Sequence, residues 1–139
     1  MKIINKKIFI LMLILISSLL IFSCGTPNLP KGFDSEEVEN RTREIIKVIN
    51  TKDYDDIHAL IKEDLQALTT PEQLKEGWAP MLDNAGEFIE INELILSGER
   101  GEKDIFFAMA IVKCEYENDN HIYTFYFDDN MELVGLYMK

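Results

Sequence analysis

The chain has few of the residues that build disulfide-rich, metal-binding or nucleic-acid-binding proteins. Its 139 residues include only 2 cysteines, 2 histidines and 14 Lys+Arg against 25 Asp+Glu. Two cysteines cannot form a disulfide-dense scaffold. The formal net charge of -11 argues against a partner such as nucleic acid, because phosphate binding needs a clustered basic face. With no internal repeat or low-complexity tract, the length suits one domain with one hydrophobic core.

Motifs for several kinds of chemistry are absent as well. The sequence has no His-x-x-x-His, no cysteine pair and no His-Glu-x-x-His, so nothing supports a zinc site. It has no Gly-x-Ser-x-Gly and no phosphate-binding or dinucleotide-binding glycine pattern. The acidic run over residues 53–56 lacks the glycine turn and bidentate acid of a calcium loop, so we interpret it as a solvated helix start. We expect no metal and no cofactor.

The first residues have the pattern of an export signal. Lys2, Lys6 and Lys7 precede an uncharged run over residues 8–22. At about 1.5 Å per residue this run spans roughly 22 Å, less than the ~30 Å hydrocarbon core of a bilayer. A secretory signal peptide over residues 1–23 therefore fits better than a permanent membrane span.

The end of this run resembles the lipobox of bacterial lipoproteins. Ile21-Phe22-Ser23-Cys24 has an aliphatic residue three positions before a cysteine and a small residue directly before it. The resemblance implies cleavage before Cys24 and a diacylglycerol on its thiol. It predicts a lipid anchor on the extracytoplasmic face of the cell membrane, followed by an extended tether up to residue 32. The alternatives to a lipoprotein signal are an ordinary signal peptide followed by a chance cysteine and an uncleaved anchor helix. Removal of residues 1–23 takes three lysines and no acid, which changes the net charge from -11 to -14.

The spacing of apolar residues predicts three helices. One begins near Asp34 or Ser35, with its inner face made by Val38, Thr42, Ile45, Ile46 and Ile49. A short second helix is capped by Asp53. Thr70-Pro71-Glu72-Gln73 starts a third helix, which ends at Gly86. Residues 63–68 are ambiguous between a helix end and a turn.

Four strands follow the helices. Apolar and β-branched runs predict strands over residues 88–96, 105–116, 121–127 and 131–138, with a loop over residues 97–101. Short connections require antiparallel pairing, so the strands form a meander with the helices on one face. The expected fold is an α+β domain over residues 33–139. Cys114 falls in an apolar strand pattern and is expected to be a buried, inert thiol.

Short motifs along this domain carry a resemblance to a known family. They are Phe33-Asp34, Thr70-Pro71-Glu72-Gln73-Leu74 with Trp78, Gly86-Glu87-Phe88, Cys114-Glu115-Tyr116, and Phe127-Asp128 followed by Leu133 and Gly135-Leu136. In order and spacing they resemble domain-of-unknown-function family 3887, found in lipoproteins of Gram-positive bacteria. That family is assigned to the nuclear-transport-factor-2-like, or cystatin-like, superfamily. The resemblance implies a curved, cone-like sheet and no established activity.

The function expected from these observations is a non-catalytic domain that binds a small ligand or a protein. No set of side chains is placed for catalysis, so no catalytic residue is assigned. A pocket would be lined by Tyr54, His58, Trp78, Tyr123 and Phe125, since aromatic rims are usual in such sites. Core packing of the aromatic residues is the alternative, because they fall at helix or strand spacing.

Two other functions stay open. Enzymes of the superfamily use His, Asp or Tyr inside the cone, which implies a small isomerase or dehydratase with His58 or His121 as the base. A structural or inhibitory interaction protein would instead show an exposed apolar patch or an unpaired sheet edge.

Overall fold

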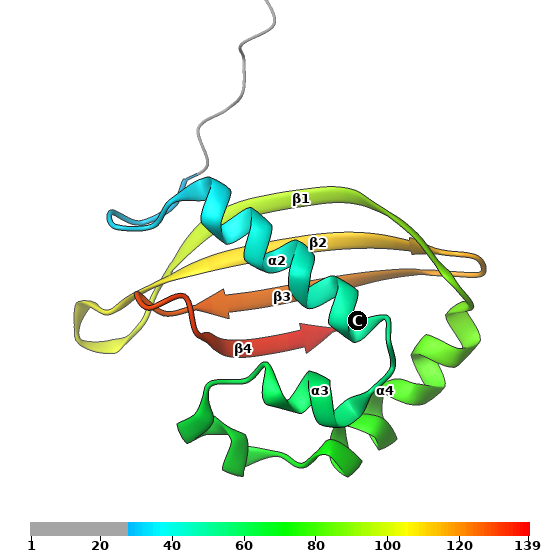
Figure 1. The fold of residues 1–139 in the computed structure, drawn as a ribbon. Helices are drawn as coiled ribbons and strands as arrows, with labels where there is room; N and C mark the ends of the chain where they lie inside the picture. The colour runs from blue at the N-terminus through cyan, green and yellow to red at the C-terminus, as the bar shows by residue number, and fades with distance from the viewer. Residues whose placement is uncertain (1–27) are drawn as a thin grey trace, which may run out of the picture.

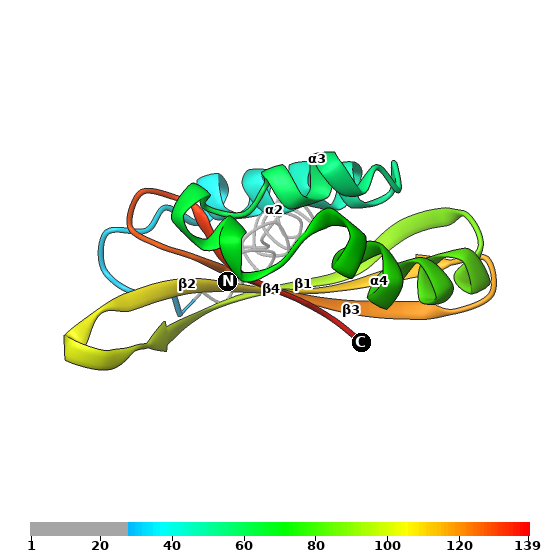
Figure 2. The same cartoon turned by 90° about the horizontal axis from the view of Figure 1, so that it is seen from below.

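Helices cover one face of a four-stranded sheet in the computed structural model, which describes residues 28–139 (Figures 1 and 2). The predicted α+β class, with helices first and a meander after them, is confirmed. Residues 1–23 and Cys24 lie outside the described part of the chain. Within residues 28–139, no helix is long and apolar enough to cross a membrane.

The helices begin and end where capping residues predict. They are α2 (Ser35–Ile49), α3 (Tyr54–Ala59), the 3₁₀-helix η1 (Glu63–Leu68) and α4 (Pro71–Ala85). The Asp34 and Asp53 carboxylates accept from first-turn amides of α2 and α3. Thr70 and Gln73 form the predicted capping box of α4, and Gly86 ends that helix with a φ of 80°. Residues 63–68, for which the sequence leaves a helix end and a turn as alternatives, form η1.

The sheet has the order β1-β2-β3-β4, and every neighbouring pair is antiparallel. Its strands are β1 (Phe88–Arg100), β2 (Phe106–Tyr116), β3 (Asn120–Phe127) and β4 (Leu133–Met138), with the short 3₁₀-helix η2 (Glu102–Asp104) between β1 and β2. The loop predicted over residues 97–101 is wrong for residues 97–100, which pair with residues 106–109. Hydrogen bonds between paired strands join backbone groups and do not depend on the side chains. The polar, glycine-containing segment over residues 97–100 can therefore continue β1.

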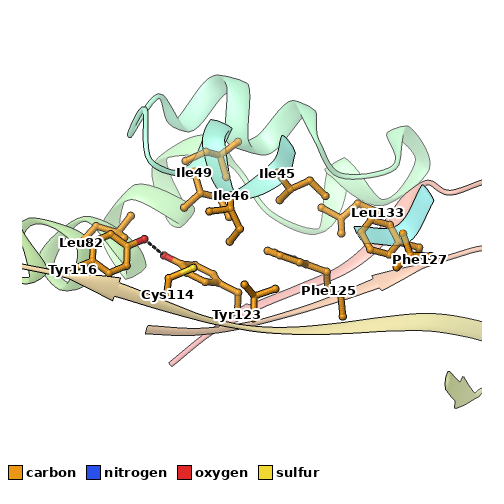
Figure 3. Packing of buried hydrophobic residues seen from close by; sticks show 14 of the residues in the cluster. Ile45, Ile46, Ile49, Leu82, Cys114, Tyr116, Tyr123, Phe125, Phe127 and Leu133 are labelled. Carbon is orange, nitrogen blue, oxygen red and sulfur yellow. Dashed lines mark hydrogen bonds between the residues drawn. The ribbon is translucent and has the colours of Figure 1, made fainter. Parts of the chain in front are cut away.

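The core lies between the helices and the inner face of the sheet. Alternate residues of β2 and β3 point toward the helices and are buried, as the strand pattern predicts: Ala108, Ala110, Val112, Cys114, Tyr116, His121, Tyr123, Phe125 and Phe127. Figure 3 shows Phe125 facing Ile45 and Ile46 of α2. Burial of this apolar surface, at about 25 cal/mol per Å², holds α2 on the sheet.

Among residues 28–139, no helix covers the opposite face of the sheet (Figure 2). Strand register places Ile95, Ile111 and Tyr137 in one row on this outer face, with Ile95 46% and Tyr137 62% exposed. A Cβ added at Gly135 would lie 2.8 Å from Cδ2 of Tyr126, so the glycine lets that ring lie across β4. The outer face is therefore partly apolar and open to solvent.

Candidate functional site

Four of the five predicted pocket residues lie together between the helices and the sheet. The Tyr123 ring stacks on Phe125 at a centroid distance of 6.0 Å and meets Trp78 edge-on at 6.3 Å. Tyr54 belongs to the same buried cluster and is 9% exposed. Tyr123 and Phe125 have no exposed surface, so in this conformation they pack as core residues.

His58, the fifth predicted pocket residue, closes a loop on the helical side. Its Nε2 lies 3.0 Å from the Gln66 carbonyl oxygen and 2.9 Å from the Thr69 carbonyl oxygen. Carbonyl oxygens only accept hydrogen bonds, so Nε2 carries a proton and donates to both. His58 thereby ties α3 to η1 and to the segment that leads into α4.

A chain of hydrogen bonds runs from the end of α2 into the core. The Tyr116 hydroxyl donates to Asn50 Oδ1 at 2.8 Å, and the Tyr116 and Tyr123 hydroxyls lie 2.7 Å apart (Figure 3). Since Tyr116 uses its proton on Asn50, Tyr123 donates to Tyr116. Burial raises the pKa of Tyr116 to about 12 and raises the pKa of Tyr123 still further. Both phenols are therefore neutral at physiological pH.

His121 lies beside these tyrosines and is 4% exposed. Its ring centroid is 5.2 Å from that of Tyr116 and 6.5 Å from that of Tyr123. The His121 Nε2 and the Tyr54 hydroxyl are buried without a hydrogen-bond partner among residues 28–139. Buried polar atoms without a partner are uncommon, because each costs about 1–3 kcal/mol.

Cys114 lies opposite His121 in the β2–β3 ladder and is buried, as predicted. Burial raises the pKa of its thiol to about 12. The thiol is therefore protonated at neutral pH, which makes it a poor nucleophile. In the part of the chain that the structure describes, no group of three or more His, Cys, Asp or Glu side chains is placed to hold a metal ion.

A groove of about 620 Å³ lies between α2 and the first half of β1. Ile46, Phe88 and Ile91 give it an apolar lining, and Arg43, Lys47 and Glu90 add charges. Asn50 also lines the groove, so the groove reaches the hydrogen-bonded chain that continues to Tyr116. Pockets of roughly 300–1,000 Å³ with few polar groups are typical of small-ligand sites.

The two cations of the α2–β1 groove differ in their surroundings. The Arg43 guanidinium is already paired with Glu39, at 2.7 Å between Nη2 and Oε1. Lys47, one turn further along α2, makes no ion pair with any residue from 28 to 139. Lys47 is therefore the cation available to an anionic group of a ligand.

Comparison with known proteins supports the fold. Residues 42–136 match the model of a family described as "Protein of unknown function (DUF3887)". Among curated proteins, none has a sequence that matches this chain. A similar solved structure is described as "NMR structure of protein from Ruminococcus gnavus ATCC 29149". It is 30% identical with a TM-score of 0.70, and the match covers 80% of this chain and 96% of that chain.

Proposed function

The chain belongs to the DUF3887 family of proteins of unknown function, and we propose that it is a lipoprotein anchored on the extracytoplasmic face of the cell membrane. The uncharged run that ends at Cys24 supports the anchor. The domain serves as a non-catalytic binding module. Helices on one face of an antiparallel meander support the wider assignment to the nuclear-transport-factor-2-like superfamily.

The α2–β1 groove is the observation that carries the binding role. Its apolar lining favours an apolar ligand body, since burial of such a surface supplies affinity. Lys47 favours an anionic group on the same ligand. The ligand class is therefore a small amphipathic anion.

Decanoate is a suitable probe, because it joins an apolar chain to one carboxylate. We expect Lys47→Glu to weaken decanoate binding by about 5–30-fold. The substitution replaces an attraction to the carboxylate by a repulsion, a change worth about 1–2 kcal/mol. Isothermal titration calorimetry measures the dissociation constant. Lys75→Glu is the matched control, since Lys75 is an exposed lysine of α4 that does not line the groove. Equal affinities for the wild type and Lys47→Glu would contradict the groove as the site.

The anchor is tested by Cys24→Ala in cells that export the protein. We expect the variant to stay unprocessed or to leave the membrane fraction, because the thiol that carries the diacylglycerol is gone. Fractionation and the intact mass of the protein measure this outcome. Cys114→Ala is the control, since Cys114 is buried in the domain and should not alter anchoring. A Cys24→Ala protein that fractionates and migrates like the wild type would disprove the lipoprotein proposal.

A second candidate function is a small isomerase or dehydratase. The buried Nε2 of His121, which has no hydrogen-bond partner among residues 28–139, favours it. This atom lies beside two neutral tyrosines, and an imidazole can act as a base and a phenol as a donor. A substrate would have to reach a residue that is 4% exposed. Two-dimensional NMR of the His121 imidazole during ligand titration distinguishes the two functions. A substrate of the enzyme would contact Nε2 and shift its resonance, whereas a ligand in the α2–β1 groove would make no direct contact with Nε2.

A further inference from the structure

The chain is short between the proposed anchor and the described domain. Four peptide units join Cys24 to Asn28, a reach of at most about 14 Å. Asn28 and Pro30 lie against Gly98, near the C-terminal end of β1. A Cβ added at Gly98 would meet the Pro30 ring at 2.7 Å, and Leu29 packs against the core. Residues 28–31, which the sequence places in the extended tether, are therefore attached to the domain.

The β1–β2 hairpin ends beside this attachment point. Phe106 lines the same surface groove as Leu29 and Pro30. Ile105 is 53% exposed and Phe106 is 47% exposed, although both are large apolar residues. Figure 1 shows the yellow hairpin tip on the same side of the molecule as the blue segment that leads into α2. The tip therefore lies near the end of the domain that the anchor holds.

The end of the domain formed by the hairpin tip and the attached residues 28–31 is uncharged overall in a strongly acidic protein. Three cations, Lys31, Arg100 and Lys103, offset three acids, Glu99, Glu102 and Asp104. Arg100 and Asp104 pair with each other. Because anionic lipid repels acidic surfaces, a neutral end with apolar side chains approaches a bilayer at lower electrostatic cost than the rest of the domain.

From these observations we propose that the tip of the β1–β2 hairpin inserts Ile105 and Phe106 into the interface of the membrane that carries the anchor. The proposal rests on the lipid anchor of the proposed function. Segments that lie in the membrane interface combine exposed apolar side chains with cations, and here Lys31, Arg100 and Lys103 are close in the sequence or the fold to Ile105 and Phe106. The acyl chains supply the attachment, and the tip sets the orientation of the domain.

This orientation places the α2–β1 groove away from the lipid. The groove uses residues 88–91 at the start of β1, and the tip follows Arg100 at its end. At about 3.3 Å per residue, the strand separates them by roughly 30 Å. The groove is then open to a solute of the extracytoplasmic space and not to the bilayer surface.

Fluorescence of the full, lipidated chain tests the contact. The chain is reconstituted in vesicles of phosphatidylglycerol and phosphatidylethanolamine, with or without bromine on the acyl chains. In a Trp78→Phe background, Phe106→Trp should show a blue-shifted emission and lose intensity in brominated vesicles. Ile89→Trp in the same background is the control, because Ile89 is 52% exposed near the start of β1, at the opposite end of this strand from the tip, and should show no loss.

Hydrogen exchange of the wild type adds a test without a substitution in the core. Amides of residues 100–106 should exchange more slowly on vesicles than in detergent. The double variant Ile105→Ser, Phe106→Ser should lose this protection while still floating with the vesicles.

The outcomes separate the two proposals. A chain that does not float with vesicles overturns the anchor, and the membrane contact with it. A chain that floats, but shows equal quenching at positions 106 and 89 and no slower exchange of residues 100–106, overturns the contact alone. Quenching and protection confined to the tip support it.

Discussion

Truncation of Phe125 to alanine will lower the free energy of unfolding by about 3–5 kcal/mol, at the top of the range for single substitutions. Phe125 has no exposed surface and stacks on Tyr123 at 6.0 Å. It also faces Ile45 and Ile46 of α2, so it packs the inner face of the sheet against the helical layer (Figure 3). The loss combines the transfer free energy of the ring with the cavity that it leaves.

Urea unfolding followed by circular dichroism measures this loss. A domain of this size has a total stability of about 5–15 kcal/mol, so the midpoint should fall far below that of the wild type. Phe106→Ala is the matched control, since it removes the same side chain from a site that is 47% exposed on the same sheet. Its effect should stay within about 1 kcal/mol. Similar losses for the two variants would show that the core is not organised around Phe125.

Local sequence patterns predicted most of the fold because they depend on neighbours along the chain. Thr70 and Gln73 bond to each other's amides within one turn, so the capping box is visible as a spacing. The alternation of apolar residues along β2 and β3 likewise identifies the buried face of the sheet. The same alternation places Phe106 on the buried face, yet it is half exposed, because the hairpin tip extends beyond the helical layer (Figure 2).

The candidate site could not be predicted, because distant segments form it. Asn50 and Tyr116 are 66 residues apart in the sequence, and only the placement of α2 on the sheet joins them. The α2–β1 groove likewise needs the packing of Lys47 beside the first residues of β1. The sequence predicts His58 as a pocket residue. Nothing in its sequence neighbourhood indicates the two carbonyl oxygens that accept hydrogen bonds from its Nε2.

Replacement of Asp128 by alanine will lower the free energy of unfolding by about 2–3 kcal/mol, because one buried carboxylate organises the turn between β3 and β4. Its Oδ1 accepts from the amides of Asn130 at 3.0 Å and Glu132 at 2.9 Å. Its Oδ2 lies 2.8 Å from Lys62 Nζ. The Lys62 amide also donates to the Leu133 carbonyl oxygen, so this turn holds the segment before η1 against β4.

The loss should depend on pH in a definite direction. Burial alone would raise the pKa of Asp128, but the Lys62 ammonium and the two amides outweigh it and hold that pKa below its ordinary value of 3.8. The folded state therefore binds the proton less readily than the unfolded state. The stabilisation is present above about pH 4 and is lost as the pH falls through the lower, folded-state pKa.

Hydrogen bonds from Lys62 to Asp128, and then to Glu132, raise the pKa of Lys62 above its ordinary value of 10.5. Its contribution is therefore present below that pH and declines above it, as the unfolded state loses its proton first. The difference in unfolding free energy between the wild type and Asp128→Ala should thus be constant from pH 6 to 8 and shrink at both extremes.

Two further variants separate the charge from the turn. Asp128→Asn keeps an acceptor for the two amides, so it should lose less stability than Asp128→Ala and show a weaker dependence on acid pH. Asp129→Ala changes an exposed acid next to it and should have little effect. Urea titrations at several pH values measure all three. If Asp129→Ala were as destabilising as Asp128→Ala, or if the loss did not shrink in acid, the ion pair with Lys62 could not be what holds the segment before η1 against β4.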